Sequence, residues 1–335
     1  MRKNILVILL VVVIFVDVHA QNSLKTDTTF CVPRVLGVPR AKGLVIKHET
    51  LLDYSIKSKN EDTGLISESQ IRRNSRLELK LKFPVVRKEE FKMVVGARYF
   101  SEEFYFENPN SLISPFYKNL EDRALKSIRG DLLIVKPTQS SRFYILRLSA
   151  GFNGDYNSEK FGEDKSEFLK YSIASLMGWK KNDYLSYAVG LSFGYTFGNR
   201  SLIPIFSYNK TFNQHWGVES ILPSNAKLRY NTLDKKNYFY LSTELKGANY
   251  SVGLSDDQVN LMFLDKSEMR MLIIWEREIH DWLWLGVEGG YRKNISFDLA
   301  DSPRIGSNII LDNSLKDAVV FNFSLFIVPP RKFFD

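Results

Sequence analysis

The chain has 335 residues, a formal net charge of +8 and one cysteine, Cys31. A single cysteine excludes an intramolecular disulfide framework. The positive charge is spread along the chain without a concentrated basic block, which argues against nucleic acid as a partner. This length fits two soluble domains or one large barrel.

Residues 1–20 have the pattern of a secretory signal peptide, with a basic start, an apolar run from Ile5 to Val16 and a cleavage site near Ala20. The apolar run is too short for a transmembrane helix, and no later segment approaches the roughly 18 apolar residues that a spanning helix needs. Residues 21–42 are polar and lack alternation, so we expect them to form an extended periplasmic lead-in. The sequence predicts that residues 43–335 form the folded part.

Period-two alternation runs through residues 43–335. It is clearest in 184–197, YLSYAVGLSFGYTF, where one parity is apolar and aromatic and the other is small and mildly polar. Segments of this kind are, in chain order, 43–57, 76–83, 91–99, 126–136, 142–153, 168–179, 184–197, 202–212, 216–222, 226–231, 238–251, 268–279, 282–292 and 318–328. They predict an all-β protein.

The connections alternate between short and long, as in bacterial transmembrane barrels. Short polar turns are expected at 87–90, 137–141, 180–183, 213–215, 232–237 and 280–281, and long outer loops at 58–75, 107–125, 154–167, 252–267 and 293–315. Two outer connections, 199–200 and 223–225, are short, and 216–231 can also be interpreted as one bent strand. A soluble sandwich would also alternate, with its apolar faces inward. The signal peptide and the loop asymmetry favour an antiparallel transmembrane β-barrel of 12–14 strands, with both termini in the periplasm.

Charged side chains share the parity opposite the apolar one, and in a barrel this parity faces the lumen, because a charge facing lipid costs a few kcal/mol. The predicted lumen-lining residues are Lys47, Glu49, Asp53, Arg76, Glu78, Lys80, Lys82, Lys92, Arg98, Arg147, Lys227, Arg229, Glu244, Lys246, Arg270, Glu276, Glu288 and Arg292. Cations outnumber anions in this set. The sequence therefore predicts a mildly cationic lumen.

Catalytic and cofactor motifs are absent from the sequence. The three histidines beyond the leader are His48, His215 and His280, of which the last two sit in predicted turns. Glu276, Glu278 and Glu288 share a parity, but carboxylates in a charged lumen usually form ion pairs. We therefore expect no catalytic, metal-binding or cofactor-binding residues and no enzymatic activity, with a barrel hydrolase as the least favoured reading.

Three motifs resemble the outer-membrane β-barrels of unassigned function found in Bacteroidota: LEDRALKSI at 120–128, PIFSYNKTFNQHW at 204–216 leading into LPSNAKLRY at 222–230, and WEREIHDWLWLGVEGGY at 275–291. The resemblance covers residue 43 to the end and implies an outer-membrane location. Outer-membrane lipid, barrel-assembly machinery and periplasmic chaperones would be its partners. It assigns no catalytic or binding residue. The C-terminus departs from many barrels, because Asp335 follows the final aromatic pair.

Two functions of different class remain open. In the first, the barrel is a passive or substrate-specific channel whose cationic lumen concentrates small anionic solutes. In the second, its charges pair across a closed lumen, and the protein is a structural or binding barrel that acts through its extracellular loops. The width of a 12–14-strand barrel favours the channel.

Overall fold

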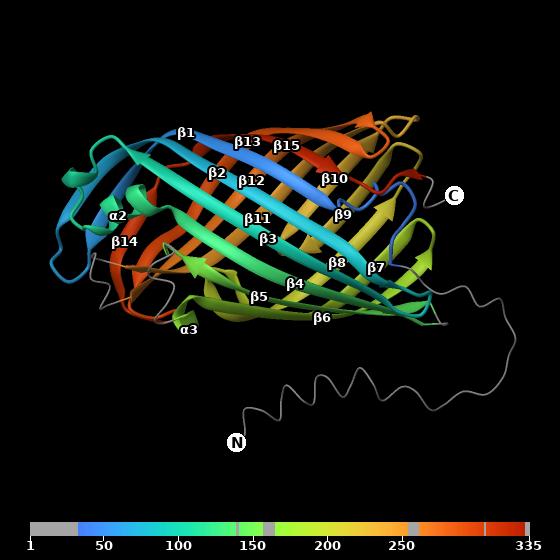
Figure 1. Cartoon of the computed structure of the whole chain (residues 1–335), viewed down its shortest axis with the longest axis horizontal. Coiled ribbons are helices and arrows are strands. Elements are labelled where there is room, and N and C mark those ends of the chain that lie inside the picture. The colour runs from blue at the N-terminus through green and yellow to red at the C-terminus, as the bar shows by residue number, and fades with distance from the viewer. Residues whose placement is uncertain (1–32, 139–140, 157–164, 254–260, 305, 332–335) are drawn as a thin grey trace, which may run out of the picture.

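The computed structural model describes residues 33–138, 141–156, 165–253, 261–304 and 306–331. The signal peptide, its cleavage site, residues 21–32 with Cys31 and the final residues 332–335 lie outside the described part. The described residues form a closed antiparallel β-barrel (Figure 1). No helix in this part of the chain is long and apolar enough to cross a membrane.

From β1 to β13 each strand pairs with the next in sequence, and β14 and β15 close the barrel between β13 and β1. The strands are β1 Leu44–Asn60, β2 Ile66–Arg87, β3 Lys92–Phe106, β4 Leu125–Pro137, β5 Arg142–Gly154, β6 Leu169–Asn182, β7 Leu185–Phe197, β8 Asn199–Thr211, β9 Trp216–Leu222, β10 Asn225–Asn231, β11 Asn237–Gly253, β12 Leu261–His280, β13 Leu283–Ala300, β14 Ile309–Leu315 and β15 Ala318–Ile327. Both β14 and β15 pair with β1 on one side and β13 on the other. They therefore share one position, and the barrel has 14 strands, the upper end of the predicted range.

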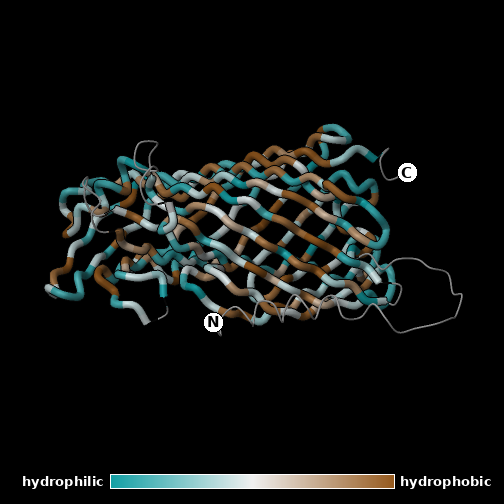
Figure 2. Tube along the Cα trace, turned by 60° about the horizontal axis from the view of Figure 1, so that its bottom comes forward, coloured by the Kyte–Doolittle hydropathy of each residue, from teal (hydrophilic) through white to brown (hydrophobic). Residues whose placement is uncertain are grey.

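The apolar parity faces outward, as a transmembrane barrel requires. In β15, Phe321 and Phe323 are 54% and 51% exposed, whereas Asn322 and Ser324, which alternate with them, are buried. A soluble sandwich would show the opposite pattern. Hydrophobic residues recur along the strands over the middle of the barrel, and hydrophilic residues gather at both ends (Figure 2). This arrangement matches a wall whose middle faces lipid.

Several segments predicted as loops are strands. β2 starts at Ile66, ten residues before the predicted 76, and pairs there with the end of β1. β12 starts at Leu261, and β14 occupies part of the predicted loop 293–315. These extensions lie at the loop end of the barrel, where neither face meets lipid, so their sequences do not alternate between apolar and polar although the ladder continues. The segment 216–231, left open as one bent strand, forms two strands, β9 and β10.

The two ends of the barrel differ. The described start and end of the chain lie at one end, where Arg40 donates to the carbonyl of Pro329, together with the short turns (Figure 1). We call this the turn end. The opposite, loop end carries three short helices, η2 Pro109–Ser111, α2 Phe116–Arg123 and α3 Lys165–Phe168.

Candidate functional site: a charged and closed lumen

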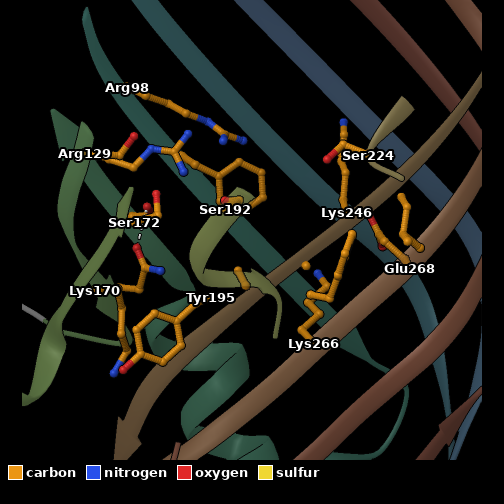
Figure 3. Close-up of a pocket in the computed structure, with 18 of the residues that line it drawn as sticks. Arg98, Arg129, Lys170, Ser172, Ser192, Tyr195, Ser224, Lys246, Lys266 and Glu268 are labelled. Atoms are coloured by element: carbon orange, nitrogen blue, oxygen red, sulfur yellow. Dashed lines mark hydrogen bonds between the residues drawn. The ribbon is translucent and has the colours of Figure 1, made fainter. Parts of the chain in front are cut away.

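A cavity of about 400 Å³ occupies the middle of the barrel. Its lining in the described chain contains ten cationic side chains and three carboxylates: Lys47, Arg76, Lys80, Arg98, Arg129, Arg147, Lys170, Lys246, Lys266 and Arg270, with Glu49, Glu78 and Glu268. Nine of the residues predicted to line the lumen are in this set. Figure 3 shows several of them: the guanidinium groups of Arg98 and Arg129 point toward each other, and the amino group of Lys170 lies beside Tyr195.

One side of the cavity is a buried network of ion pairs contributed by β1, β2, β3 and β12. The Arg76 guanidinium contacts Glu49 at 2.6 Å, Glu102 at 2.8 Å and Glu268 at 2.9 Å. Arg270 joins Glu49 and Glu268 from the opposite side, and Lys266 pairs with Glu102. All six side chains are buried. Each of the three carboxylates contacts two cationic side chains. These ion-paired side chains therefore fill this part of the lumen.

Further ion pairs link other predicted lumen residues. Lys47 contacts Glu288 at 2.6 Å across β1 and β13. Glu244 lies between Lys246 and Lys227, at 3.1 and 3.7 Å. Glu78 similarly binds Lys80 and Arg98. These contacts neutralise the lumen around β1, β2, β10 and β11.

The cavity wall formed by β4, β5 and β6 carries the excess positive charge. Arg129 and Arg147 share a single carboxylate, Asp131, at 3.7 and 3.1 Å. Lys170 of β6 donates to the carbonyl of Glu167 and to the hydroxyl of Ser251, and within the described chain it has no carboxylate at ion-pair distance. Nε of Arg129 is buried without a hydrogen-bond partner in the same part of the chain. An anion in the cavity would satisfy these groups.

The loop end is closed by an apolar plug, which we define as helix α2 and the residues it packs against. Phe116, Tyr117 and Leu120 of α2 are at most 1% exposed and pack inside the rim against Phe104, Phe106 and their neighbours. The Tyr117 hydroxyl anchors the helix through Ser58 at 2.6 Å and Asn313 at 2.5 Å. The sequence predicted this segment as part of an outer loop and gave no signal that it folds inward.

We expect Tyr117→Phe to lower the free energy of unfolding by about 1–3 kcal/mol, because it leaves buried polar groups of Ser58 and Asn313 without a partner. Tyr105→Phe is the matched control, since its hydroxyl contacts Glu103 at an exposed position. Urea unfolding of the barrel in lipid vesicles, followed by tryptophan fluorescence, measures both. Equal stabilities of the two variants would show that Tyr117 does not anchor the plug.

The turn end is closed by residues 33–42 of the lead-in. Val35 is buried, and Arg229 of β10 binds the carbonyl of Gly37. Arg40 donates to Asp281 at 2.9 Å, and Lys42 contacts Glu276 at 2.5 Å. The lead-in was predicted to be an extended periplasmic segment, and these described residues lie across the mouth of the barrel. Most of their contacts are polar, so they form a weaker seal than the apolar plug.

Asp281 lies in the turn between β12 and β13, outside the membrane-spanning part. Desolvation raises the pKa of this carboxyl, but the backbone N–H of Arg331 and the guanidinium group of Arg40 outweigh it and hold the pKa below its usual value. A lowered pKa means that the contact stabilises the closed mouth from neutral pH down to the point where Asp281 gains a proton. The contact between Arg40 and Asp281 is therefore present at neutral pH and lost in strong acid.

Asp53 is a correction to the predicted lumen set. Asp53 has a φ of 27° and is skipped in the β1–β2 register, which runs from Leu52–Arg73 to Tyr54–Ile71. This irregularity reverses the parity, so Asp53 is exposed and Tyr54 points inward. Lys82 is also exposed and Lys92 half-buried, both in the part of β2 and β3 near the turn end. Arg292 is buried and stacks on the Tyr54 ring, 4.5 Å from its centroid.

The tip of the β7–β8 hairpin bends into the barrel, which the sequence did not predict. Asn199 donates to Asp265 of β12, and a Cβ at Gly198 would overlap the same carboxylate. A Cβ at Gly247 of β11 would likewise overlap the backbone of Phe197. Gly198 has a φ of +92°, so glycine is needed there for the backbone as well. This inward tip narrows the lumen between the cavity and the loop end.

Solved transmembrane barrels share only the general fold with this chain. The deltaS2S3 mutant of the monoaromatic hydrocarbon channel TodX, a Pseudomonas putida protein, is 7% identical with a TM-score of 0.39, over 86% of this chain and 91% of that chain. The translocator domain of NalP from Neisseria meningitidis is 9% identical with a TM-score of 0.34, over 85% and 88%. The Escherichia coli outer membrane protease OmpT is 7% identical with a TM-score of 0.27, over 87% and 99%. Similarities this low support no inference about function, and no family model or curated protein matches the chain.

Proposed function

We propose that this protein is an outer-membrane conduit for small anionic solutes, substrate-specific and closed at both ends at rest. The observation that carries the proposal is the cavity wall of β4, β5 and β6. There Arg129 and Arg147 share Asp131, and Lys170 has no carboxylate at ion-pair distance in the described chain. Cations in a cavity with low-dielectric walls raise the local concentration of anions. The ion pairs elsewhere hold the wall together.

The outer-membrane location rests on the closed ladder and the outward apolar parity. The ladder closes the sheet on itself, apart from a short gap beside the turn between β9 and β10, and its exterior exposes large apolar side chains over many strands. The secretory leader predicted for residues 1–20 supplies the export step. Insertion by barrel-assembly machinery, delivery by periplasmic chaperones and membership of the Bacteroidota barrels of unassigned function belong to the same proposal.

A non-catalytic role fits the carboxylates that the sequence singled out. Glu276 contacts Lys42, Glu278 contacts Arg331 and Arg40, and Glu288 contacts Lys47 and Asn322. Each carboxylate is engaged in a charge-assisted contact, which suits a structural role better than general acid or base chemistry.

Solute entry into proteoliposomes tests the proposal. The assay uses a barrel opened at both ends, in which the mature chain starts at Ala41 and a Gly-Ser linker of the same length replaces residues 109–123. In this opened barrel we expect gluconate to enter several-fold faster than glucose, which has a similar size and no charge, and we expect the double variant Arg129→Glu/Arg147→Glu to remove this preference. Arg72→Glu is the matched control, because Arg72 is an exposed cation that pairs with Glu107 outside the lumen. Equal rates for gluconate and glucose in the opened barrel would reject an anion-selective conduit.

A closed binding barrel is the second candidate, and one observation favours it: the plug and the lead-in occupy opposite ends of the same lumen. In that case neither solute enters the proteoliposomes at any rate above that of empty vesicles. Binding through the extracellular loops would then be the remaining role.

A further inference from the structure

The barrel wall has a notch beside the turn that joins β9 and β10. β9 and β10 have 7 residues each, whereas the flanking strands β8 and β11 have 13 and 17. The β8–β9 ladder ends at the pair Phe206–Leu222, and the β10–β11 ladder ends at Asn225–Glu244. Beyond these pairs, the facing edges of β8 and β11 form no ladder with each other in the described chain. β11 makes one bridge to Gly154 of β5, and Gly247 of β11 packs against the backbone of Phe197 and Gly198 at the tip of the β7–β8 hairpin. The gap between β8 and β11 therefore ends where this tip meets Gly247. We use "notch" for this gap between β8 and β11.

The central cavity extends through the notch. Leu245 of β11 belongs to the outward parity, because its ladder partner Met269 is 41% exposed. Leu245 nevertheless lines the cavity. Tyr171, which is 47% exposed on β6, lines the same cavity. A cavity in contact with outward-facing residues of β6 and β11 reaches the outer surface of the wall.

The notch is apolar, and the cavity behind it is cationic. Ile203 and Ile205 of β8 and Ile221 of β9 have the inward parity that elsewhere carries charged or small polar side chains, and all three line the cavity. Ile221 is 44% exposed although it faces inward, as expected beside an opening. The same cavity contains Lys170, Arg129 and Arg98, and Figure 3 shows these three with Ser224 of the β9–β10 turn.

The notch lies at the level of the lipid-facing band. Leu202 and Leu222, which flank it, are 63% and 45% exposed, and Leu241 of β11 is 52% exposed. Large apolar side chains exposed in this way belong in the hydrocarbon region. Since the plug and the lead-in close the two axial ends, the notch is the route by which the cavity communicates with the surroundings in the described chain, and it communicates with lipid.

We propose that the cavity binds a single-chain anionic amphiphile that enters sideways through the notch, with its head group against Lys170, Arg129 and Arg98 and its alkyl chain along Ile203, Ile205 and Ile221. This inference rests on the proposed function and names its substrate class. An alkyl chain is stabilised by apolar contact in proportion to its length. Its anionic head satisfies the guanidinium Nε groups of Arg98 and Arg129, which are buried without a hydrogen-bond partner in the described chain. A hydrophilic anion without an alkyl chain would gain nothing from contact with the three isoleucines.

Photocrosslinking of the full-length mature protein in nanodiscs tests the proposal. The probe is a palmitate analogue with a diazirine in the alkyl chain, and the matched neutral probe is the corresponding alcohol. We expect the carboxylate probe to label peptides that contain residues 203–222 at least fivefold more than the alcohol does. Lys170→Glu should lower this labelling by at least fivefold, and Ile205→Trp, which fills the notch, should lower it similarly. Ile273→Trp is the control, because Ile273 is 69% exposed on the outer face of β12 and lines neither cavity nor notch.

Heat-modifiable migration in electrophoresis verifies that each variant forms a barrel, and Lys170→Gln provides a milder second variant if Lys170→Glu does not fold. Equal labelling by the carboxylate and the alcohol, or labelling unaffected by Ile205→Trp, would overturn the proposal. The gluconate assay distinguishes a failure of the proposed substrate class from a failure of the proposed conduit. If gluconate entry is anion-selective and the amphiphile fails to label the notch, the substrate class is wrong and the conduit stands. If neither is observed, the conduit itself fails.

Discussion

We expect Arg76→Met to lower the free energy of unfolding by about 3–5 kcal/mol, the largest loss from any single lumen substitution considered. Arg76 is the cation shared by Glu49, Glu102 and Glu268, all of them buried. Removing one partner from a buried network leaves uncompensated charge in a poorly solvated interior, and this costs far more than the intact pairs contribute. Methionine nearly keeps the side-chain volume, so the lost free energy of unfolding measures the effect of removing the charge.

Arg72→Met is the matched control for this effect. Arg72 is four residues away on the same strand, and its pair with Glu107 is at least half exposed on both sides, so we expect a change of at most about 1 kcal/mol. Urea unfolding in lipid vesicles compares the two variants with the unaltered protein. If Arg76→Met were no more destabilising than Arg72→Met, water would have to reach the network, and the lumen would be open rather than filled at this level.

The sequence could predict the strands wherever one face meets lipid and the other does not. Ala318 to Ile327 alternates without error between buried and exposed residues, and the prediction for that strand, 318–328, is nearly exact. The same rule fails where both faces meet water or protein. Leu311 and Leu315 of β14 pack into the interior at the loop end, and nothing in the local pattern distinguishes this short strand from a loop.

The lumen set illustrates a second limit. Alternation correctly predicts that Lys47 and Glu49 both face the lumen. This inference holds only while the ladder has no irregularity. One irregularity at Asp53 reverses every later residue of β1, so that Tyr54 and Ile56 are buried. The backbone conformation of one aspartate is a local choice that alternation cannot reveal.

Long-range contacts set a third limit. The plug depends on α2 meeting the inner faces of distant strands, for example Tyr117 with Asn313. The notch depends on the unequal lengths of β8 to β11, of which the sequence showed only that the connection 223–225 is short. Its apolar lining could have been noticed at Ile203 and Ile205, which break the small or polar pattern of the lumen parity.

The second large effect that we expect is steady ion conduction, and it should require opening both ends. In one variant the lead-in is removed so that the mature chain starts at Ala41. In another, residues 109–123 are replaced by a Gly-Ser linker of the same length, which deletes α2. We expect each variant alone to remain closed in planar bilayers, because the other seal is intact and the notch opens to lipid, which carries no ion current.

The combination of both changes should give stable, anion-selective openings, since ions then pass from the turn end through the cationic cavity to the loop end. Replacing the exposed residues 61–65 by a Gly-Ser linker of the same length is the control for chain alteration and should leave the barrel closed. Arg129→Glu with Arg147→Glu in the doubly opened barrel should reduce the preference for anions, because these two guanidinium groups share only Asp131.

Conduction by either single variant would show that the remaining segment is not a seal. A doubly opened barrel that stays closed at every voltage would mean that the buried ion pairs around Arg76 fill the lumen, and the protein would then be a closed barrel whose ligand enters and leaves through the notch.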